Sequence, residues 1–338
     1  MLRRPGSPRP RLRGPVRFRL LAVVAAASLL TLASCAGDDL ADEADDPGSA
    51  GESDEPAAPA GEEDRGPLTI ASQNFGEAQL VAAMYDLLLT EAGFDTEVQL
   101  VAARDAYMRT FPGTVDVVPE YVGGIVNFLN AQAGGSDAEP LTAGDGEELA
   151  EQGAELLEEQ GITLLDLSSA TDANAFFVTA ERAEADGLET LSDLEGESVV
   201  LAAAPDCEGR LDCEGGLSDE YGIDVTKVLP LGYASDQTYR AVLDGEADLG
   251  ETSTTDGTLE TQGLVVLDDD RQVQPAQNLV PAVATDFLEQ HPEVADVLNP
   301  LMAALTTDKL TELNGRISVD REKPADVAAD FLQEEGLL

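Results

Sequence analysis

Val115-Asp116-Val117-Val118-Pro119-Glu120-Tyr121-Val122-Gly123-Gly124 is the stretch from which the fold can be predicted. Its β-branched residues between Val115 and Val118 indicate a short buried strand. Pro119 has no N–H to give to a neighbouring strand, so we expect strand pairing to stop there. Glu120 and Tyr121 follow at the carboxyl end of this strand, where a helix begins. Because ligands of open α/β sheets bind at that edge, the junction is a candidate binding site.

Strand and helix patterns alternate on both sides of this junction. The expected strands are 68–72, 97–101, 115–118, 162–165, 175–179, 198–202, 227–231, 247–250, 263–267 and 279–283. The expected helices are one capped by Asn74 and ended by Gly93, then 121–131, 146–160, 236–243, 286–290, 293–304, 307–314 and 324–335, with a short helix or turn at 192–194. Such alternation predicts parallel α/β sheets.

Two polar segments divide the strands and helices into two groups. The segment 168–174 is the expected first crossing between lobes, and Asp268-Asp269-Asp270 begins the return. The sequence therefore predicts a two-lobed α/β protein. Lobe 1 comprises residues 67–170 and 277–338, and residues 171–276 form an inserted lobe 2.

The chain is strongly acidic. It has 338 residues and a formal net charge of −48, and 43% of its residues are hydrophobic, which is enough for real cores. Such a charge repels nucleic acid and anionic lipid surfaces, so we expect neither as a partner. The alternatives for the acidic residues are an ordinary solvated surface or an acidic docking face.

The N-terminal region has the layout of a lipoprotein signal. Residues 1–35 contain seven Arg, no acidic residue, the apolar run 20–32, and Leu-Ala-Ser-Cys ending at Cys35. This ending resembles the lipobox of bacterial lipoproteins, which implies acylation of Cys35 and anchoring at the outer face of the cytoplasmic membrane. Residues 36–66 carry 12 acidic residues and one Arg and show no apolar periodicity, so we expect a disordered tether.

Few residues are suited to catalysis. His291 is the single histidine and precedes a proline between two helical patterns, so we expect it at a helix boundary. One His and three Cys exclude most histidine-dependent metal sites and the common His-based catalytic triads. No paired-carboxylate motif stands out, so we expect neither an enzyme nor a cofactor.

Cys207 and Cys213 lie in a turn-rich loop that would be outside the cell if the signal is correct. A disulfide is the expected state there. A metal site is the alternative.

The order of motifs along 68–338 resembles the substrate-binding lipoproteins of ABC importers for glycine betaine, choline, carnitine and related osmoprotectants. The residues that carry the resemblance are 70–77, 116–123, 191–194, 221–224, 245–249, 255–257, 264–270, 313–314 and 331–332. It implies a type II periplasmic-binding-protein fold with the ligand in a cleft between lobes, whose closure is sensed by a membrane permease.

The same resemblance implies a partly lost aromatic cage. Quaternary ammonium groups are held by cation–π contact with aromatic rings, and Tyr121 matches one cage tyrosine. The other cage positions align with Asn174, Ser253 and Gln277, a frequent threonine aligns with Gly124, and a frequent glutamine with Ala78. Replacement rings are available from Tyr107, Tyr233 or Tyr239. The expected ligand-binding residues are Asn74, Tyr121, Asp172, Asn174, Ser253, Thr254, Asp256, Gln277 and Asn278.

The resulting hypothesis is a monomeric solute-binding lipoprotein of an ABC importer. Its ligand would be a glycine betaine-like osmoprotectant or a related small polar solute. A sensor or interaction lipoprotein of the same fold that has lost import is the alternative, and an exported hydrolase is a third.

Overall fold

The computed structural model describes residues 65–135 and 138–338. The predicted signal peptide 1–35, its Cys35 and the tether up to residue 64 lie outside the described residues. The last two residues of the predicted tether are described, and they are already joined to the folded part. Arg65 N donates to Gly93 O at 3.0 Å, and Gly66 O accepts from Asp95 N at 2.9 Å.

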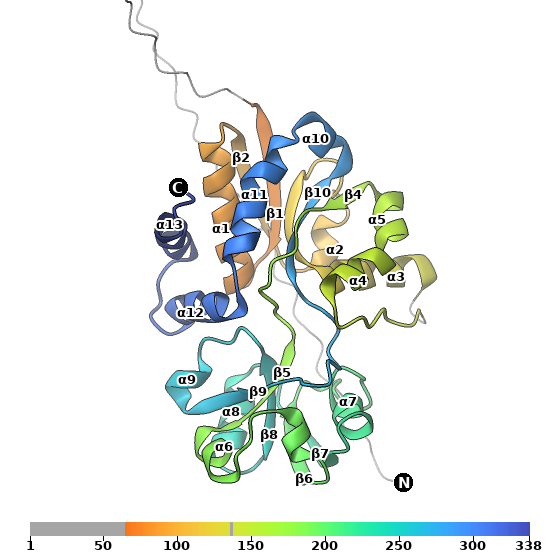
Figure 1. Ribbon diagram of the computed structural model, residues 1–338, viewed down its shortest axis with the longest axis vertical. Coiled ribbons are helices and arrows are strands. Elements are labelled where there is room, and N and C mark those ends of the chain that lie inside the picture. The colour runs from red at the N-terminus through yellow and green to blue at the C-terminus, as the bar shows by residue number, and fades with distance from the viewer. Residues whose placement is uncertain (1–64, 136–137) are drawn as a thin grey trace, which may run out of the picture. The chain divides into compact units, whose positions relative to one another are not determined.

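Lobe 1 is built on a five-stranded mixed sheet (Figure 1). Its strand order is β2 (Asp95–Val101), β1 (Pro67–Gln73), β3 (Val117–Tyr121), β10 (Leu279–Ala284) and β4 (Ile162–Leu164). β1 runs parallel to β2 and β3, whereas β10 is antiparallel to β3 and β4. The predicted parallel pairing is therefore found for β2, β1 and β3. β10 departs from it because β10 enters this sheet from the other lobe and not through a crossover helix.

Pro119 does not end its strand as predicted. β3 pairs with β10 through five positions, and Pro119 lies opposite Pro281. On its other side β3 pairs with β1 at Ile70↔Val117. Pro119 can remain in the strand because hydrogen bonds to β10 form at alternate positions, as Val122 N to Asn278 O and Ala284 N to Asp116 O show. The Pro119–Pro281 pair lies between such positions, where no N–H is needed across the ladder.

Helices cover both faces of this sheet. They are α1 (Gly76–Glu91), α2 (Arg104–Tyr107), α3 (Val122–Gly134), α4 (Gly146–Gln152), α5 (Ala154–Gln160), α10 (Thr285–Gln290), α11 (Glu293–Ala304), α12 (Thr307–Ser318) and α13 (Pro324–Glu334). α1, α11, α12 and α13 pack on one face through residues such as Leu80, Met84 and Leu298, which are fully buried. α3, α4 and α5 pack on the other face around Ile125, Leu149 and Leu157.

The ends of these helices differ from the predicted ones at two places and agree at a third. α1 is capped by Phe75 and not by Asn74, whose Oδ1 instead accepts from Gln79 Nε2 at 3.0 Å. The predicted helix 146–160 is two helices that meet at Gly153, where a Cβ atom would lie 2.6 Å from Val126 of α3. His291 is at a helix boundary as predicted, at the C-cap of α10.

Lobe 2 contains a second five-stranded mixed sheet. Its order is β7 (Asp224–Pro230), β6 (Ser198–Ala203), β8 (Leu249–Ser253), β5 (Asn174–Thr179) and β9 (Leu264–Leu267). β5 is antiparallel to both of its neighbours, so parallel pairing is confined to β7–β6–β8. The helices are α6 (Ala180–Asp186), the 3₁₀ helix η1 (Leu191–Leu194), α7 (Glu214–Asp219), α8 (Asp236–Leu243) and α9 (Leu259–Gln262).

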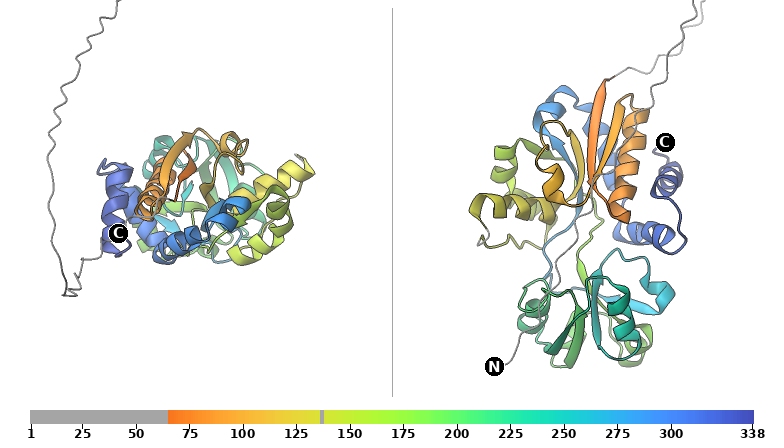
Figure 2. Two further views of the ribbon diagram at one scale, coloured as in Figure 1. Left: turned by 90° about the horizontal axis from the view of Figure 1, so that it is seen from above. Right: turned by 180° about the vertical axis from the view of Figure 1, so that it is seen from behind.

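Two chain segments cross between the lobes (Figure 2, right). They run side by side, because Thr171 and Asn278 form an isolated antiparallel bridge. The residue limits given above for the two lobes remain a prediction. Among the described residues, no helix is long and apolar enough to cross a membrane.

Candidate functional site

The crossings are joined to each other and to lobe 2 by hydrogen bonds. Asp172 N donates to Gln277 O at 3.2 Å. Thr254, which directly follows β8, donates its hydroxyl to Thr171 O at 2.6 Å and its N–H to Ala173 O at 3.0 Å. The Thr254 side chain is therefore hydrogen-bonded to the backbone of the first crossing.

A cavity of about 630 Å³ lies between the lobes beside these crossings, and we call it the carboxylate cavity. Lobe 1 contributes Glu77 and Asn314, the crossing contributes Asp172, and lobe 2 contributes Tyr233 and other residues. The remaining lining residues are Phe75, Gly76, Ala234, Asp236, Tyr239, Ser253, Thr255, Asp256, Gly257, Thr258, Gln262, Ser318 and Arg321. Arg321 is the one basic residue among these described residues, against four acidic ones.

Glu77 is held rigidly in this wall. It lies in the first turn of α1 and its residue is 5% exposed. Its Oε1 accepts from the Tyr121 hydroxyl at 2.5 Å and its Oε2 from Asn314 Nδ2 at 2.5 Å. A carboxylate at this position is favoured by the partial positive charge of a helix N-terminus. Burial, together with the Glu77 charge, holds the pKa of the Tyr121 hydroxyl well above its ordinary value.

Asp172 is the least satisfied carboxyl group of the cavity. Its Oδ1 is buried and has no hydrogen-bond partner in the described structure. Burial, followed by the Glu77 charge, raises the pKa of Asp172 to about 7, and the Ser253 and Thr255 hydroxyls oppose this rise. The carboxyl group therefore changes its charge close to neutral pH.

Asp256 and two tyrosines complete the lobe 2 wall. Asp256 Oδ2 accepts from the Tyr239 hydroxyl and from Thr252 Oγ1, each at 2.6 Å, and its Oδ1 accepts from Thr258 N at 2.9 Å. The Tyr233 ring is free to meet a ligand, because the residue is 43% exposed. Carboxylates and tyrosine rings both attract cations, so the cavity is suited to a positively charged group.

A second cavity, of about 660 Å³, is lined by two arginines from opposite lobes, Arg104 and Arg210, and we call it the arginine cavity. Arg104 donates through Nε and Nη2 to the two oxygens of Glu120, at 2.7 and 2.9 Å. Glu120 is fully buried and also accepts from the Tyr107 hydroxyl. The guanidinium occupies the space above Gly124, where a Cβ atom would lie 2.2 Å from Arg104 Nη2.

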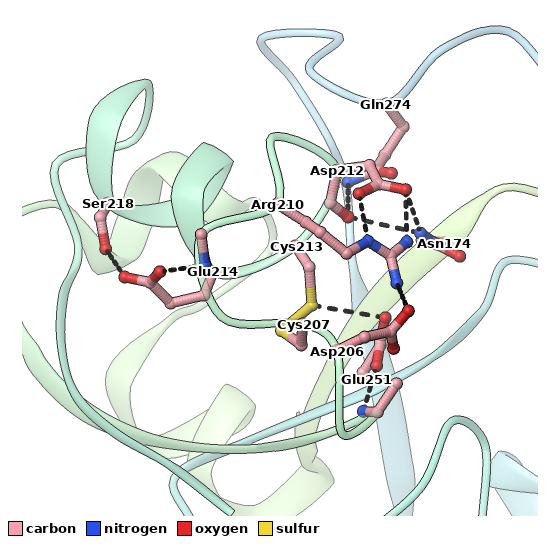
Figure 3. The surroundings of a disulfide bond; sticks show 12 residues. Asn174, Asp206, Cys207, Arg210, Asp212, Cys213, Glu214, Ser218, Glu251 and Gln274 are labelled. Atoms are coloured by element: carbon pink, nitrogen blue, oxygen red, sulfur yellow. Dashed lines mark hydrogen bonds and ion pairs between the residues drawn. A yellow bond between two sulfur atoms is a disulfide. The ribbon is translucent and has the colours of Figure 1, made fainter. Parts of the chain in front are cut away.

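The other side of this arginine cavity is a disulfide loop (Figure 3). Cys207 and Cys213 are joined, as predicted. Asp212, in the same loop, accepts from Asn174 Nδ2 at 3.2 Å through its carboxylate and from Gln274 Nε2 at 3.1 Å through its backbone carbonyl. The loop is thus attached to both crossings.

The buried Glu251 carboxylate lies beneath the disulfide. Its Oε2 accepts from Ala204 N at 2.7 Å, and its Oε1 is 3.4 Å from Cys213 Sγ. Cys207, Cys213 and Glu251 each place one potential ligand atom within 4.8 Å of the other two. While the two sulfurs are bonded to each other they are not thiolate ligands for a metal.

A third cavity, of about 760 Å³, is a groove between α12 and the segment that contains α9 and β9. It is lined by charged residues from both sides, such as Glu260 and Asp308, and it contains no aromatic residue among those described. It therefore offers no ring to a cationic ligand.

The predicted site residues are divided among these places. Asp172, Ser253 and Asp256 line the carboxylate cavity, Gln277 lines the arginine cavity, and Thr254 and Asp256 line the third cavity. Four residues lie outside the linings: Asn74, Tyr121, which reaches Glu77 from the core, Asn174, which is held by Asp212, and Asn278, whose Nδ2 donates to Ser168 O at 2.9 Å.

Sequence reasoning overlooked Glu77 and Asn314. Both lie within the motifs that carried the family resemblance, but one acid among 67 gives no local sign that it is buried. Of the suggested replacement rings, Tyr233 and Tyr239 line the carboxylate cavity. Tyr107 is 2% exposed and lies beneath Arg104 instead.

Two α/β lobes, two crossings and a cation-suited cavity between the lobes define a two-lobed solute-binding protein with a type II periplasmic-binding-protein fold. Residues 66–334 match the family described as the substrate binding domain of the ABC-type glycine betaine transport system, and the chain belongs to that family.

Curated relatives and solved structures agree with this assignment. The chain is 29% identical over 290 residues to the glycine-betaine-binding protein of Pseudomonas aeruginosa. The match covers 80% of this chain and 88% of the relative. It is 26% identical to the glycine betaine-binding protein YehZ of Escherichia coli, over 80% and 91% of the two chains.

The solved structures show the same fold. A crystal structure titled glycine betaine/carnitine/choline ABC transporter superposes with a TM-score of 0.69 at 24% identity, covering 80% of this chain and 99% of the other. Apo YehZ from E. coli gives a TM-score of 0.65 at 24% identity, with the same coverage of each chain.

Proposed function

We propose that this protein captures a small ammonium-type osmolyte, of the class that includes glycine betaine, carnitine and choline, in the carboxylate cavity and delivers it to an ABC permease. The observation that carries this proposal is the charge of the lining, which has four acidic residues and one arginine. Family membership supports transport, and the lining supports a cationic group as the part of the solute that is recognised.

The aromatic part of the proposed site differs from the one expected from the resemblance. Tyr121 supports the site through Glu77, and Tyr233 and Tyr239 supply the rings. Each ring contributes about 0.5–2 kcal/mol of cation–π attraction. The carboxylates Glu77, Asp172 and Asp256 add long-range attraction, which is strengthened by their partial removal from water.

The remaining predictions about location and partners belong to the same proposal. The mature protein would be lipid-anchored through Cys35 at the outer face of the cytoplasmic membrane, and it would act as a monomer without enzymatic activity. The alternative of an import-inactive sensor has no specific observation in its favour. Closure of the two lobes on the solute would be the signal that the permease recognises.

A ligand screen with matched variants tests the proposal. Calorimetry and thermal shift on the full chain, with glycine betaine, carnitine and choline, should detect at least one ligand. Tyr233→Ala should weaken its binding about tenfold, because a ring that attracts the cation is removed. Leu243→Ala is the control, since Leu243 is equally exposed, at 44%, but outside the cavity. A chain that binds no ammonium solute would contradict the proposal.

A further inference from the structure

No hydrogen-bond donor among the described residues reaches the buried Oδ1 atom of Asp172. Buried carboxylate oxygens are almost always hydrogen-bonded, so an exception in a cavity wall indicates a missing partner. Asp172 also lies at the crossing between the lobes, where a ligand would meet both of them. The missing donor is therefore a property of the site and not of a remote part of the fold.

Several donors around Asp172 are already engaged elsewhere. The Ser253 and Thr255 hydroxyls face the carboxyl group, but they leave its Oδ1 atom without a hydrogen bond in the described structure. The Tyr121 hydroxyl donates to Glu77, and the Tyr239 hydroxyl donates to Asp256. Asn314 Nδ2 is shared between Glu77 Oε2 and Thr255 O. Asp172 Oδ1 is therefore open to a donor from a ligand, or to a proton on the carboxyl group itself.

Glu77 and Asp256 are not equivalent acceptors. Both oxygens of Glu77 accept hydrogen bonds from Tyr121 and Asn314, and both oxygens of Asp256 accept from Tyr239, Thr252 and Thr258. These two carboxylates attract a positive charge of any shape. The fourth acid, Asp236, is exposed to solvent, so Asp172 is the lining acid with a buried oxygen that is ready to accept a directed hydrogen bond in the described structure.

We propose that the carboxylate cavity prefers ammonium compounds that retain at least one N–H over their quaternary analogues. This inference rests on the proposed function, and it assigns the specificity to Asp172. A quaternary nitrogen has no hydrogen to donate and would leave Oδ1 without a partner. A protonated tertiary or secondary amine has the same charge and nearly the same size, and it donates a charge-assisted hydrogen bond. A site that hydrogen-bonds an N–H rejects analogues that lack it.

The electrostatic surroundings favour the charged form of such an amine. Glu77 on α1, Asp256 after β8 and Asp236 on α8 face the same cavity as Asp172, with Tyr233 beside them. Arg321 is the opposing charge among the described lining residues. An amine would therefore stay protonated in the cavity and keep the hydrogen that Asp172 accepts.

A methylation series separates this inference from the proposed function. Calorimetry on the full chain at pH 8 would compare choline with N,N-dimethylethanolamine, and glycine betaine with N,N-dimethylglycine. The tertiary amine of at least one pair should bind at least tenfold more tightly than its quaternary partner. The wild-type series alone is decisive, even if no variant folds.

Two variants assign the preference to one carboxylate. Asp172→Asn should reduce the tenfold preference to less than threefold. Asp236→Asn, which removes a charge from the same cavity, should weaken both members of a pair equally and leave their ratio unchanged. Quaternary solutes that bind as tightly as tertiary ones would overturn the inference and leave the proposed function standing. Failure of every ammonium solute to bind would overturn both.

Discussion

The backbone of Gly257 in lobe 2 lies directly against the backbone of Gly315 in α12 of lobe 1. A Cβ atom on Gly257 would be 2.3 Å from Gly315 N and 2.3 Å from Thr311 O. The hydrogen bonds around this contact also join the lobes, since Asn314 Nδ2 donates to Thr255 O at 3.0 Å and Thr311 Oγ1 donates to Thr254 O at 3.3 Å. The absence of a side chain at 257 is what allows this close approach.

Gly257→Ala should therefore destabilise the protein by about 1–3 kcal/mol, because the added methyl group forces α12 away from lobe 2. Urea unfolding measures the change. Gly76→Ala is the control, since its Cβ would meet Ile317 at an ordinary 3.5 Å. That variant should keep its stability or gain up to about 1 kcal/mol from helix propensity. Equal effects of the two substitutions would show that the contact between the lobes does not matter for stability.

Arg104→Ala should cost about 3–5 kcal/mol, because it leaves the fully buried Glu120 carboxylate without its counter-charge. Arg109→Ala is a matched control on the same segment. Its ion pair with Asp105 is at the surface, where the two side chains are 74% and 58% exposed. Such a pair contributes less than about 1 kcal/mol. Chemical denaturation of both variants should separate the two values clearly, and a small loss for Arg104→Ala would argue against the buried pair.

Asp172 should make the ligand-free protein less stable as the pH rises from about 4 to 7. The pKa of Asp172 is raised from 3.8 to about 7 in the folded state, mainly by burial, so in this window the folded state keeps a proton that the unfolded chain has lost. The stabilisation is complete below pH 4 and is lost as the pH passes 7, and it amounts to no more than roughly 4 kcal/mol.

Unfolding free energies at pH 5 and pH 8 measure this contribution. Asp172→Asn should reduce the difference between the two pH values relative to the wild type, whereas Asp236→Asn should retain it. A variant at 172 with the same pH dependence as the wild type would show that another group is responsible. The comparison of variants matters because the many surface acids also affect the pH profile.

Replacing Cys207 and Cys213 together by Ser should lower stability by about 2 kcal/mol, the amount expected for closing so short a loop. Thermal unfolding with and without reductant provides the test. Reductant should lower the melting temperature of the wild type and leave the double variant unchanged. A wild type that is insensitive to reductant after full reduction has been verified would contradict the prediction.

Much of the fold could be predicted because its signals are local. α8 and α11 were predicted with the bounds that the structure shows, since apolar residues recur at helical spacing between clear turn residues. The break at Gly153 could not be predicted, because it depends on the distant Val126. The pairing of Pro119 with Pro281 likewise joins residues far apart in the chain.

The site was predictable as a region but not in its detailed arrangement. Asp172, Ser253 and Asp256 were expected and do line one cavity. The partnership of Tyr121 with Glu77 spans 44 residues, and that of Glu77 with Asn314 spans 237. No local pattern could show that Tyr121 would support a carboxylate from within the core. Alignment to a family gives equivalent positions, whereas burial and hydrogen bonding decide their roles.

Gly124 has a consequence for how this sequence can vary. The Arg104 guanidinium fills the volume that any side chain at position 124 would need, and Glu120 holds it there. An arginine at 104 in this conformation and a side chain at 124 are therefore mutually exclusive. Among related chains the two positions should covary, with glycine at 124 accompanying arginine at 104 and a shorter residue at 104 accompanying threonine at 124. A side chain at position 124 would therefore require the arginine to move or to be replaced, and the buried Glu120 would then lose its counter-charge.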